Sequence, residues 1–369
     1  MIRILQIGMS TNPGGVESFI MNIYRNIDRT KIQFDFLVDH NISKIAYEEE
    51  ITKMGGRIFK EYYRRKEILC KGRKSIKKFL KEHPEINGVH MHANRLDPMF
   101  KVLIIAKKMK LKKIILHSHN DGYMKEISLK DKLYEKYAKK KIRNVTTKLL
   151  ACSEEAGKWM FGNEKFEVIN NSIDINDYTF DANEREKARI DLNVSKNEKI
   201  IGTVTRLNYQ KNPQFLVRIF EEIYKKNNNV RLLIVGDGDL RDEITNLIKE
   251  MHLKDKVFLV GVKKDIRKYL SAMDCFVFPS RFEGFGIAPL EAQVAGLKCY
   301  CSDNVPRVVD CTGKVRFISL DKGVAEWAKI IEEDFENEKD ICRIEDKNLF
   351  FKYNIKNNIK NIEKIYKGE

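Results

Sequence analysis

The chain has 369 residues, of which 43% are hydrophobic and 10% aromatic, a length and composition that predict two or three globular domains and exclude a disordered chain or a fibre. Its net charge is +16, and the first 180 residues carry 35 Lys and Arg against 22 Asp and Glu. This surplus favours an anionic partner, although a solvated surface is the simpler explanation of any single basic run.

The sequence also bears on where the protein works. Its apolar runs are far shorter than the roughly 18 residues that cross a bilayer, and the N-terminus lacks the pattern of a signal peptide. The seven cysteines are an odd number without a C-x2-C pair, which favours reduced thiols over disulfides or a zinc finger. We therefore expect a cytoplasmic protein.

Short β-rich apolar runs alternate with stretches of helical periodicity along nearly the whole chain. This alternation predicts an α/β protein made of βα units, with parallel sheets covered on both faces. In the first half we expect strands near 2–7, 33–38, 86–90, 112–117, 146–151 and 166–169, and helices near 15–27, 70–82, 97–109, 128–142 and 153–161.

Residues 174–198 are polar and show no strand signal, so we expect a domain linker there. A second α/β series follows, and in two such doubly wound sheets ligands bind beyond the carboxyl ends of the strands. Its predicted strands lie near 199–205, 230–235, 256–260, 273–278 and 298–301, and its helices near 212–227, 239–252, 266–271 and 287–296.

Two glycines, Gly14 and Gly15, follow the first strand and precede the first helix. Such a turn lets the backbone approach a ligand, and a helix N-terminus offers free N–H groups to an anion. A phosphate site at Gly15 and a simple tight turn explain the pattern equally well.

Two basic residues, Arg206 and Lys211, follow the first strand of the second series. An Arg that binds bidentately and a Lys that acts as a point charge suit a diphosphate leaving group. The alternative is that each makes a surface salt bridge.

The segment 278–296 is the most informative, because it places Glu283 on a glycine-containing loop and Glu291 in the helix that follows. Glu291 can accept hydrogen bonds from both hydroxyls of a ribose, and Glu283 can meet the hydroxyls of a second sugar. The loop of Gly284, Phe285 and Gly286 can approach the phosphates or the sugar. Alternatively, Glu291 only favours the helix dipole and Glu283 is an ordinary loop residue.

These motifs together resemble a known family. Gly14-Gly15-x-Glu17, Asn171-Ser-Ile-Asp174, Arg206-x4-Lys211-Asn212, Phe278-Pro-Ser and Glu283-x7-Glu291 occur in the order typical of family-four retaining glycosyltransferases of the GT-B fold, and most closely resemble bacterial enzymes of capsule and exopolysaccharide assembly. Ser172 departs from the pattern, since the family commonly has Gly there.

The resemblance implies two Rossmann-like doubly wound domains that face across a cleft. Residues 1–180 would bind the acceptor and residues 181–350 the nucleotide-sugar. The last helix, within 351–369, would cross back to the N-terminal domain, which would bury the apolar stripe of the tail, Ile355, Ile359, Ile362 and Ile365.

The resemblance also assigns roles to residues. Arg206 and Lys211 would take the diphosphate, Glu291 the ribose and Glu283 the transferred sugar. His119 would lie beside the donor sugar, and His92 and Asn171 on the acceptor side. We expect Glu283, His119, Arg206 and Lys211 to be catalytic, and Gly15, Gly284, Phe285 and Gly286 to join them in binding the donor.

Two His-x-His pairs, His90 with His92 and His117 with His119, lie at predicted strand ends. Alternate residues of a strand share a face, which is the geometry of metal ligands in some hydrolases. The acidic ligands of a hydrolytic metal site are not evident, so we expect no metal and no other cofactor.

Asp237-Gly-Asp239 resembles the metal-binding D-x-D of the other large glycosyltransferase fold, but it closes a strand and precedes a helix. We interpret Asp239 as a helix N-cap instead.

We conclude from the sequence that the chain is a retaining, metal-independent hexosyltransferase. It would move a sugar from a nucleotide-sugar, UDP-linked by expectation, to a glycan or lipid-linked acceptor in surface polysaccharide biosynthesis. A metal-dependent hydrolase that uses the His pairs and a non-enzymatic polyanion-binding protein are the alternatives. We expect no nucleic-acid partner.

Ten basic residues lie between Lys60 and Lys81, among them Arg64, Arg65, Lys74, Lys77 and Lys78, with aromatic and aliphatic side chains between them. Such a segment can bind an anionic leaflet, so we hypothesise that the N-terminal domain docks on the inner membrane face. The alternative is that Ile76, Phe79 and Leu80 form the core face of an ordinary helix.

Overall fold

The computed structural model describes residues 1–63, 71–120, 122–123, 127–337, 343 and 346–369. It divides into two compact units, which we call unit 1 (residues 1–173 and 352–369) and unit 2 (residues 174–351). The units change after residues 173 and 351, close to the domain boundaries at 180 and 350 that the sequence suggested. No helix in the described part of the chain has the length and apolar character needed to cross a membrane.

Unit 1 is built on a seven-stranded parallel sheet. Apolar runs form its central strands, which are buried from both sides because helices cover both faces of the sheet. The strands are β1 (Ile2–Ile7), β2 (Ile32–Asp39), β3 (Arg57–Glu61), β4 (Ile86–Ala93), β5 (Lys113–Ser118), β6 (Lys148–Ala151) and β7 (Glu167–Val168). Their spatial order is β3-β2-β1-β4-β5-β6-β7, so the order reverses between β1 and β4.

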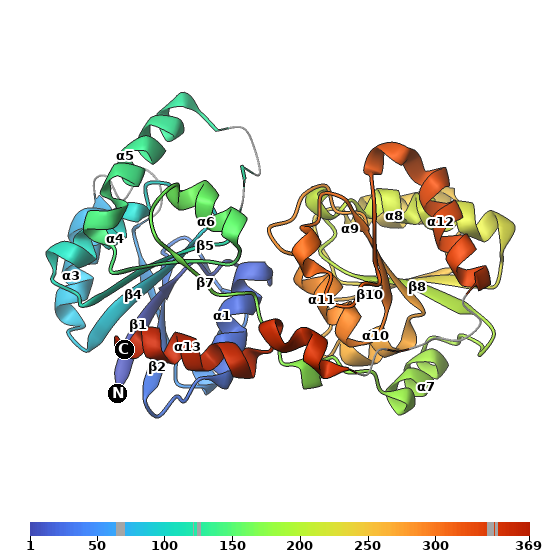
Figure 1. Cartoon of the computed structure of the whole chain (residues 1–369), viewed down its shortest axis with the longest axis horizontal. Helices are drawn as coiled ribbons and strands as arrows, with labels where there is room; N and C mark the ends of the chain where they lie inside the picture. The colour runs from blue at the N-terminus through green and yellow to red at the C-terminus, as the bar shows by residue number, and fades with distance from the viewer. Residues whose placement is uncertain (64–70, 121, 124–126, 338–342, 344–345) are drawn as a thin grey trace. The chain divides into compact units, whose positions relative to one another are not determined.

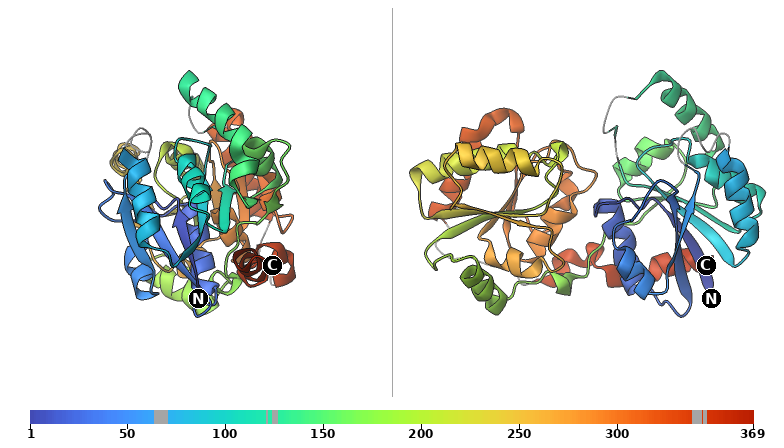
Figure 2. Two further views of the ribbon diagram at one scale, coloured as in Figure 1. Left: turned by 90° about the vertical axis from the view of Figure 1, so that its left-hand side faces the viewer. Right: turned by 180° about the vertical axis from the view of Figure 1, so that it is seen from behind.

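Helices pack on the two faces of this sheet, each over its own apolar cluster. One face carries α3 (Lys71–Glu82), α4 (Phe100–Lys108), α5 (Leu129–Val145) and α6 (Glu154–Phe161). The other carries α1 (Gly15–Asn26) and the C-terminal α13 (Ile355–Lys367), as Figures 1 and 2 show. The short helix α2 (Glu48–Lys53) leads into β3.

The tail returns to unit 1 through α13, which contacts α1 and β1. Ile355, Ile362 and Tyr366 are buried there, and Ile359 and Ile365 pack against the same cluster. The apolar stripe of the tail is therefore the core-facing side of α13.

Unit 2 repeats the architecture with a six-stranded parallel sheet of order β10-β9-β8-β11-β12-β13. The strands are β8 (Lys199–Val204), β9 (Val230–Val235), β10 (Val257–Gly261), β11 (Cys275–Phe278), β12 (Lys298–Ser302) and β13 (Val315–Ile318). α8 (Pro213–Lys226), α9 (Arg241–Glu250) and α12 (Gly323–Asn337) cover one face. α7 (Ala182–Asp191), α10 (Arg267–Ala272) and α11 (Ile287–Val294) lie on the other (Figure 1).

The expected linker at residues 174–198 is wrong. It contains α7, which packs against α10 and so belongs to unit 2. Arg185 and Arg189 on α7 pair with Asp274, and both donate to backbone carbonyls of residues 271–273. The segment is polar because charged hydrogen bonds, rather than apolar contacts, attach this helix to its unit.

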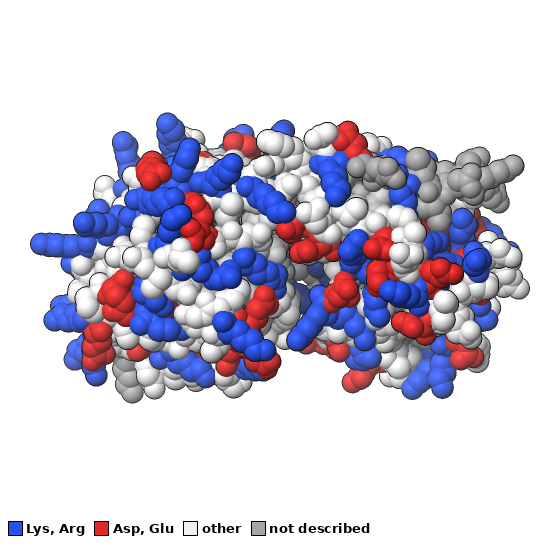
Figure 3. All heavy atoms as spheres, turned by 90° about the horizontal axis from the view of Figure 1, so that it is seen from below, with Lys and Arg blue, Asp and Glu red and all other residues white. Residues whose placement is uncertain are grey.

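Basic side chains are spread over unit 1. On the face that Figure 3 shows, Lys and Arg lie over much of this unit with acidic side chains between them. The surplus of the first half is therefore not confined to one helix.

The helix α3 decides part of the membrane hypothesis. Ile76, Phe79 and Leu80 are buried in the core of unit 1, so these side chains do not face a membrane and that part of the hypothesis is wrong. Arg64 and Arg65 lie outside the described residues.

Candidate functional site

The loops that follow β8 and β11 are joined at the carboxyl edge of the unit 2 sheet, where the strand order reverses. The backbone N–H of Arg281 donates to the carbonyl of Gln210 over 2.7 Å, and Gln210 Nε2 donates to the carbonyl of Phe282 over 2.9 Å. Arg281 Nη2 also donates to Asn212 Oδ1 over 2.9 Å. A reversal of strand order is where doubly wound sheets bind ligands, so this joined pair of loops is the candidate site of unit 2.

Lys211 and Glu283 form an ion pair on these loops. Their side chains are only 15% and 8% exposed, and Lys211 Nζ lies 4.7 Å from the centre of the Phe278 ring. Ser280 Oγ donates to Glu283 Oε1 over 2.6 Å. The sequence placed the two residues on different parts of the donor, and the structure brings them into direct contact.

Arg206 stands apart from this pair. It is exposed on the loop after β8, and its guanidinium has no ion-pair or hydrogen-bond partner within the described ranges. It is therefore a cation that can bind an anion without first breaking a contact.

The loop of residues 284–286 ends at the N-terminus of α11. Gly286 is the N-cap with a φ of 93°, a left-handed conformation that favours glycine, and no side chain caps the helix. Backbone N–H groups of the first turn are thus left for another acceptor. Phe285 is buried and anchors the loop, whereas Gly284 is partly exposed.

Glu291 lies in the second turn of α11 and is partly exposed. Burial raises the pKa of this carboxyl group to about 7, while a hydrogen bond from Tyr178 acts in the opposite direction. Near neutral pH the group is therefore divided between a carboxylate and a carboxylic acid.

The expected N-cap at Asp239 is wrong. The helix α9 begins at Arg241 with Leu240 as its N-cap, and no side chain caps it. Asp237 is the residue that holds this turn, because its Oδ1 accepts from the backbone N–H of Gly238 over 2.8 Å and its Oδ2 lies 3.2 Å from Arg241 Nη1.

In unit 1, Gly15 begins α1 directly after the loop that follows β1. The N-cap Gly14 offers no side chain to the helix, and a Cβ at Gly15 would meet no atom within 4 Å. The N-terminus of α1 therefore has space beside it, which is compatible with both the phosphate site and the simple turn, and Glu17 in the same turn accepts from the backbone N–H of Ser10.

Four histidines lie together on β4, β5 and the residue after β5. In the register of the two strands His92 lies opposite His117, and alternation places His90 and His119 on the same face. All four are buried, and the Phe19 ring of α1 makes edge contacts with three of them. Gly8 is required beside them, because a Cβ there would lie 2.8 Å from His92 Cβ.

A hydrogen bond to the Gln6 side chain sets which nitrogens of these rings carry hydrogen. His92 Nε2–H donates to Gln6 Oε1 over 2.9 Å, so Nδ1 of a neutral His92 is an acceptor. His119 Nε2 lies 2.9 Å from that Nδ1 and must donate to it. The Nδ1 of His119 is then a bare acceptor for a further hydroxyl.

The amide nitrogen of the Gln6 side chain extends the chain of hydrogen bonds to α13. Gln6 Nε2 donates to the hydroxyl of Tyr366 over 3.2 Å, and that hydroxyl donates to His90 Nδ1 over 2.6 Å. His90 Nε2 then donates to His117 Nδ1 over 3.3 Å. His117 Nε2 is buried and has no partner among the described residues.

Burial keeps these histidines neutral. It lowers the pKa of His90 and of His119 to about 3, and the pKa of His92 and of His117 falls well below the usual value for the same reason, with repulsion from neighbouring rings adding to the effect.

The ligand atoms of His90, His92 and His117 lie within 4.8 Å of one another, so metal ligation needs consideration. Both ring nitrogens of His90 and His92, and Nδ1 of His117, already take part in hydrogen bonds, and no carboxylate belongs to the group. A metal would have to displace these bonds, so the arrangement favours a hydrogen-bonded network.

Asn171 lies in the same unit and is buried, with an Oδ1 that has no partner in the described part of the chain. The neighbouring Ser172 is bound to α1 and α13, because its carbonyl accepts from Asn22 over 2.9 Å and its Oγ accepts from Asn358. The contact that depends on serine at this position is therefore the one between its hydroxyl and Asn358 of α13.

Sequence reasoning missed the residues that hold these groups, namely Ser280, Gln210, Gln6 and Tyr366. The sequence contained a signal for Ser280, because this residue belongs to the Phe278-Pro-Ser motif and lies three residues before Glu283. Gln6 and Tyr366 are 360 residues apart, and nothing in the local sequence relates them.

Comparison with known proteins identifies the family. Residues 184–363 match the family described as Glycosyl transferases group 1. The chain is also 30% identical over 338 residues to EpsF of Bacillus subtilis, a protein named as a glycosyltransferase, with 89% of this chain and 86% of EpsF covered. The chain belongs to the group 1 glycosyltransferases. The predicted family resemblance is confirmed.

Two further similarities concern a solved structure and a shorter alignment. HepE of Anabaena, crystallised with UDP and glucose, superimposes with a TM-score of 0.79 at 17% identity over 100% of both chains. This likeness confirms the predicted GT-B fold. A galactosyltransferase of Escherichia coli, named for UDP-Gal and a diphosphoundecaprenol acceptor, is 34% identical over 142 residues, which are 38% of this chain and 37% of that enzyme.

Proposed function

We propose that this glycosyltransferase is a retaining, family-four hexosyltransferase that uses a UDP-linked sugar. The observation that carries the proposal is the group of charges at the carboxyl edge of the unit 2 sheet, where the Lys211–Glu283 pair lies on joined loops and Arg206 is unpaired. The group combines cations for a diphosphate with a carboxylate for sugar hydroxyls.

In the reaction, the bond between the anomeric carbon and the diphosphate oxygen breaks, and an acceptor oxygen bonds to the same face of that carbon. The acceptor proton passes to the departing phosphate. Negative charge therefore grows on the diphosphate, where Arg206, Lys211 and the N–H groups at the start of α11 would stabilise it without a metal. Gly15 would add the N–H groups of α1.

The remaining residues would bind and orient the donor and the acceptor. Glu283, held by Lys211 and Ser280, would accept hydrogen bonds from the transferred sugar, and Glu291 from the ribose. His119 would accept a hydroxyl hydrogen through its bare Nδ1. His92 would fix the orientation of His119, and Asn171 would offer its unpartnered Oδ1 on the acceptor side.

The acceptor in this proposal is a glycan or a lipid-linked oligosaccharide of surface polysaccharide biosynthesis, made at the inner face of the cell membrane. Two observations support it: the similarity to the galactosyltransferase named for a diphosphoundecaprenol acceptor, and the net charge of +16. A cytoplasmic protein with this acceptor has to reach the membrane surface to meet it.

Nucleotide release from a panel of UDP-, GDP- and ADP-sugars tests enzyme class and donor together. We expect release with UDP-hexoses, unchanged by EDTA, and retained anomeric configuration in the product by NMR. Release only from GDP- or ADP-sugars would contradict the donor assignment, and an inverted product would contradict the mechanism.

A further inference from the structure

The outer face of α5 carries large apolar side chains that no part of the described structure covers. Leu129, Leu133 and Tyr137 are 78%, 68% and 44% exposed. They are spaced by four residues, so they form one stripe along the helix. The opposite side of α5 is buried in the core through Ala138, Ile142 and Val145.

Basic side chains border this stripe on both sides. With about 100° of rotation per residue, Lys132 and Lys136 fall on one side of the stripe, and Lys130 and Lys141 fall on the other. In projection down the helix axis, the direction of Lys140 lies between those of Leu129 and Leu133. Lys139 and Arg143 are also exposed on α5. The two acidic residues of the helix lie close to Arg95: its guanidinium is 3.5 Å from Asp131 Oδ1 and 3.8 Å from Glu135 Oε1.

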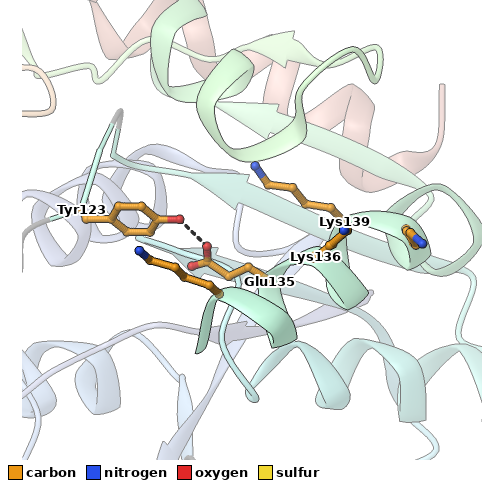
Figure 4. Close-up of a pocket in the computed structure, with 6 residues that line it drawn as sticks. Tyr123, Glu135, Lys136 and Lys139 are labelled. Carbon is orange, nitrogen blue, oxygen red and sulfur yellow. Dashed lines mark hydrogen bonds between the residues drawn. The ribbon is translucent and has the colours of Figure 1, made fainter. Parts of the chain in front are cut away.

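A groove of about 560 Å³ runs along the basic side of the stripe. It is lined by Tyr123, Glu135 and four lysines, Lys132, Lys136, Lys139 and Lys140. Figure 4 shows the Tyr123 hydroxyl directed at Glu135, to which it donates over 2.5 Å. Among the described residues that line the groove, Glu135 is the one carboxylate and is thus already bound, and the remaining charged side chains are lysines.

We infer that α5 is a membrane-docking helix that lies on an anionic phospholipid surface. The stripe would enter the headgroup layer, and the lysines of the groove would take lipid phosphates. The bilayer fits better than a second copy of the chain, because a symmetric contact through α5 would set its lysines against the same lysines. One helical stripe is also small for a stable protein interface.

The comparison with α3 sharpens this choice. α3 also carries exposed basic residues, including Lys74, Lys77 and Lys78, but its large apolar side chains are buried in the core. It can contribute charge to a surface but nothing that enters one.

The position of α5 connects docking to the acceptor. α5 is the next helix after β5 in the chain, and His119 lies at the carboxyl end of β5. Figures 1 and 2 show the N-terminal end of α5 extending beyond its neighbours. A helix docked there would hold the acceptor side of unit 1 near a lipid-linked substrate. This consequence rests on the proposed function, whereas docking itself does not.

Sedimentation of the full chain with vesicles tests the inference. We expect binding to phosphatidylcholine vesicles that contain phosphatidylglycerol, and little binding to phosphatidylcholine alone or at high salt. A triple variant, Leu129→Ser with Leu133→Ser and Tyr137→Ser, should bind at least about tenfold more weakly, as should Lys132→Gln with Lys136→Gln and Lys140→Gln.

The matched control is Lys74→Gln with Lys77→Gln and Lys78→Gln on α3, which removes the same charge and should weaken binding much less. In addition, the Tyr137→Trp variant should show a blue shift of its tryptophan emission with anionic vesicles only, and the parent should not. The inference is overturned if the parent fails to bind anionic vesicles, if the α5 variants bind like the parent, or if the emission of the Tyr137→Trp variant does not shift.

Calorimetric binding of UDP-sugars without vesicles separates this inference from the proposed function. The α5 variants should bind the donor like the parent. Vesicle binding without any donor binding would defeat the proposed function and leave docking intact, and the reverse result would defeat docking alone. An acidic protein that binds α5 while anionic vesicles do not would likewise overturn the inference.

Discussion

At the carboxyl edge of the unit 2 sheet lie the Lys211–Glu283 ion pair and the exposed Arg206, whereas the same edge of the unit 1 sheet holds four histidines that burial keeps neutral. The unit 2 site lies where the strand order reverses between β8 and β11, and the histidines on β4 and β5 lie beside the reversal between β1 and β4 in unit 1. The difference is what should distinguish a donor site, which meets a diphosphate, from an acceptor site, which meets hydroxyls. The experiments below test whether the two edges divide the chemistry in this way.

Removing a cation from unit 2 should have the largest effect. Lys211→Ala and Arg206→Ala should each lower kcat by about 100- to 1,000-fold and change donor affinity much less, because charge on the diphosphate grows toward the transition state. Lys211→Ala also leaves Glu283 buried without its partner, so the loss should be greater than in Arg206→Ala. Steady-state kinetics and calorimetry give the two quantities, and an effect on affinity alone would contradict the assignment.

Glu291 should control donor binding rather than turnover. Glu291→Ala removes a carboxylate proposed to serve two ribose hydroxyls, which should cost about 1.5 to 3 kcal/mol, or about 10- to 150-fold in Kd. The parent should also bind the donor more weakly as the pH falls below about 7, because protonation of Glu291 removes the acceptor charge.

Glu291→Gln is the control for this pH dependence. It cannot titrate, so the change of Kd between pH 7 and pH 6 should disappear in this variant. The four buried histidines of unit 1 do not contribute in that range, since burial lowers the pKa of His90 and of His119 to about 3 and the pKa of the other two well below its usual value. An unchanged Kd in Glu291→Ala, in a variant that unfolds like the parent, would remove the ribose assignment.

The fold was largely predictable because buried parallel strands are continuous apolar runs, such as Val230–Val235, and helices alternate with them. Several of the elements that were missed have weaker patterns, although α12, which was also missed, carries a buried apolar stripe that includes Trp327 and Ile331. β3 reads Arg-Ile-Phe-Lys-Glu and β13 reads Val-Arg-Phe-Ile, and both are edge strands with one partner only. α7 was missed because arginine hydrogen bonds, not an apolar stripe, attach it to unit 2.

The candidate sites were predictable as lists of residues but not as sets of contacts. Motif spacing placed Lys211 and Glu283 on loops at one sheet edge, yet their pairing depends on the Gln210 contacts that join the two loops. In unit 1, the His-x-His pairs were visible in the sequence. Their link to the C-terminal helix depends on Tyr366, which only the return of α13 to unit 1 brings to His90.

The neutral histidines of unit 1 should make folding acid-sensitive. Below about pH 6.5 each histidine takes up a proton in the unfolded chain and not in the folded one, so the free energy of unfolding falls by up to about 1.4 kcal/mol per pH unit for each. Glu291 has the opposite effect on the free energy of unfolding between pH 4.5, the pKa of an ordinary glutamate, and about pH 7. In that range the folded state holds the extra proton, so this contribution grows as the pH falls.

Urea unfolding at about pH 7 and about pH 5.5 measures this slope. His117→Asn should make it shallower by up to about 1.4 kcal/mol per pH unit, whatever the variant costs at neutral pH. His252→Asn, which replaces an exposed histidine of unit 2, is the matched control for the loss of an imidazole. A slope that His117→Asn does not alter would mean that this ring is protonated in the folded protein.

The smallest effect should come from the acidic pair Asp237 and Asp239, beside the proposed donor site. Asp237 is engaged with Gly238 and Arg241 in an exposed turn, and the metal-type cluster within the described residues consists of histidines of unit 1. If Arg206 and Lys211 supply the positive charge for the diphosphate, Asp237→Asn should change kcat by less than about twofold and stability by less than about 0.5 kcal/mol, and EDTA should leave turnover intact.

Loss of activity with EDTA and its recovery with Mn²⁺ would instead transfer the leaving-group chemistry to a metal. The charged edge of unit 2 would then have to be understood as a binding site for the donor only, and the large losses expected in Lys211→Ala and Arg206→Ala would appear in Kd rather than in kcat.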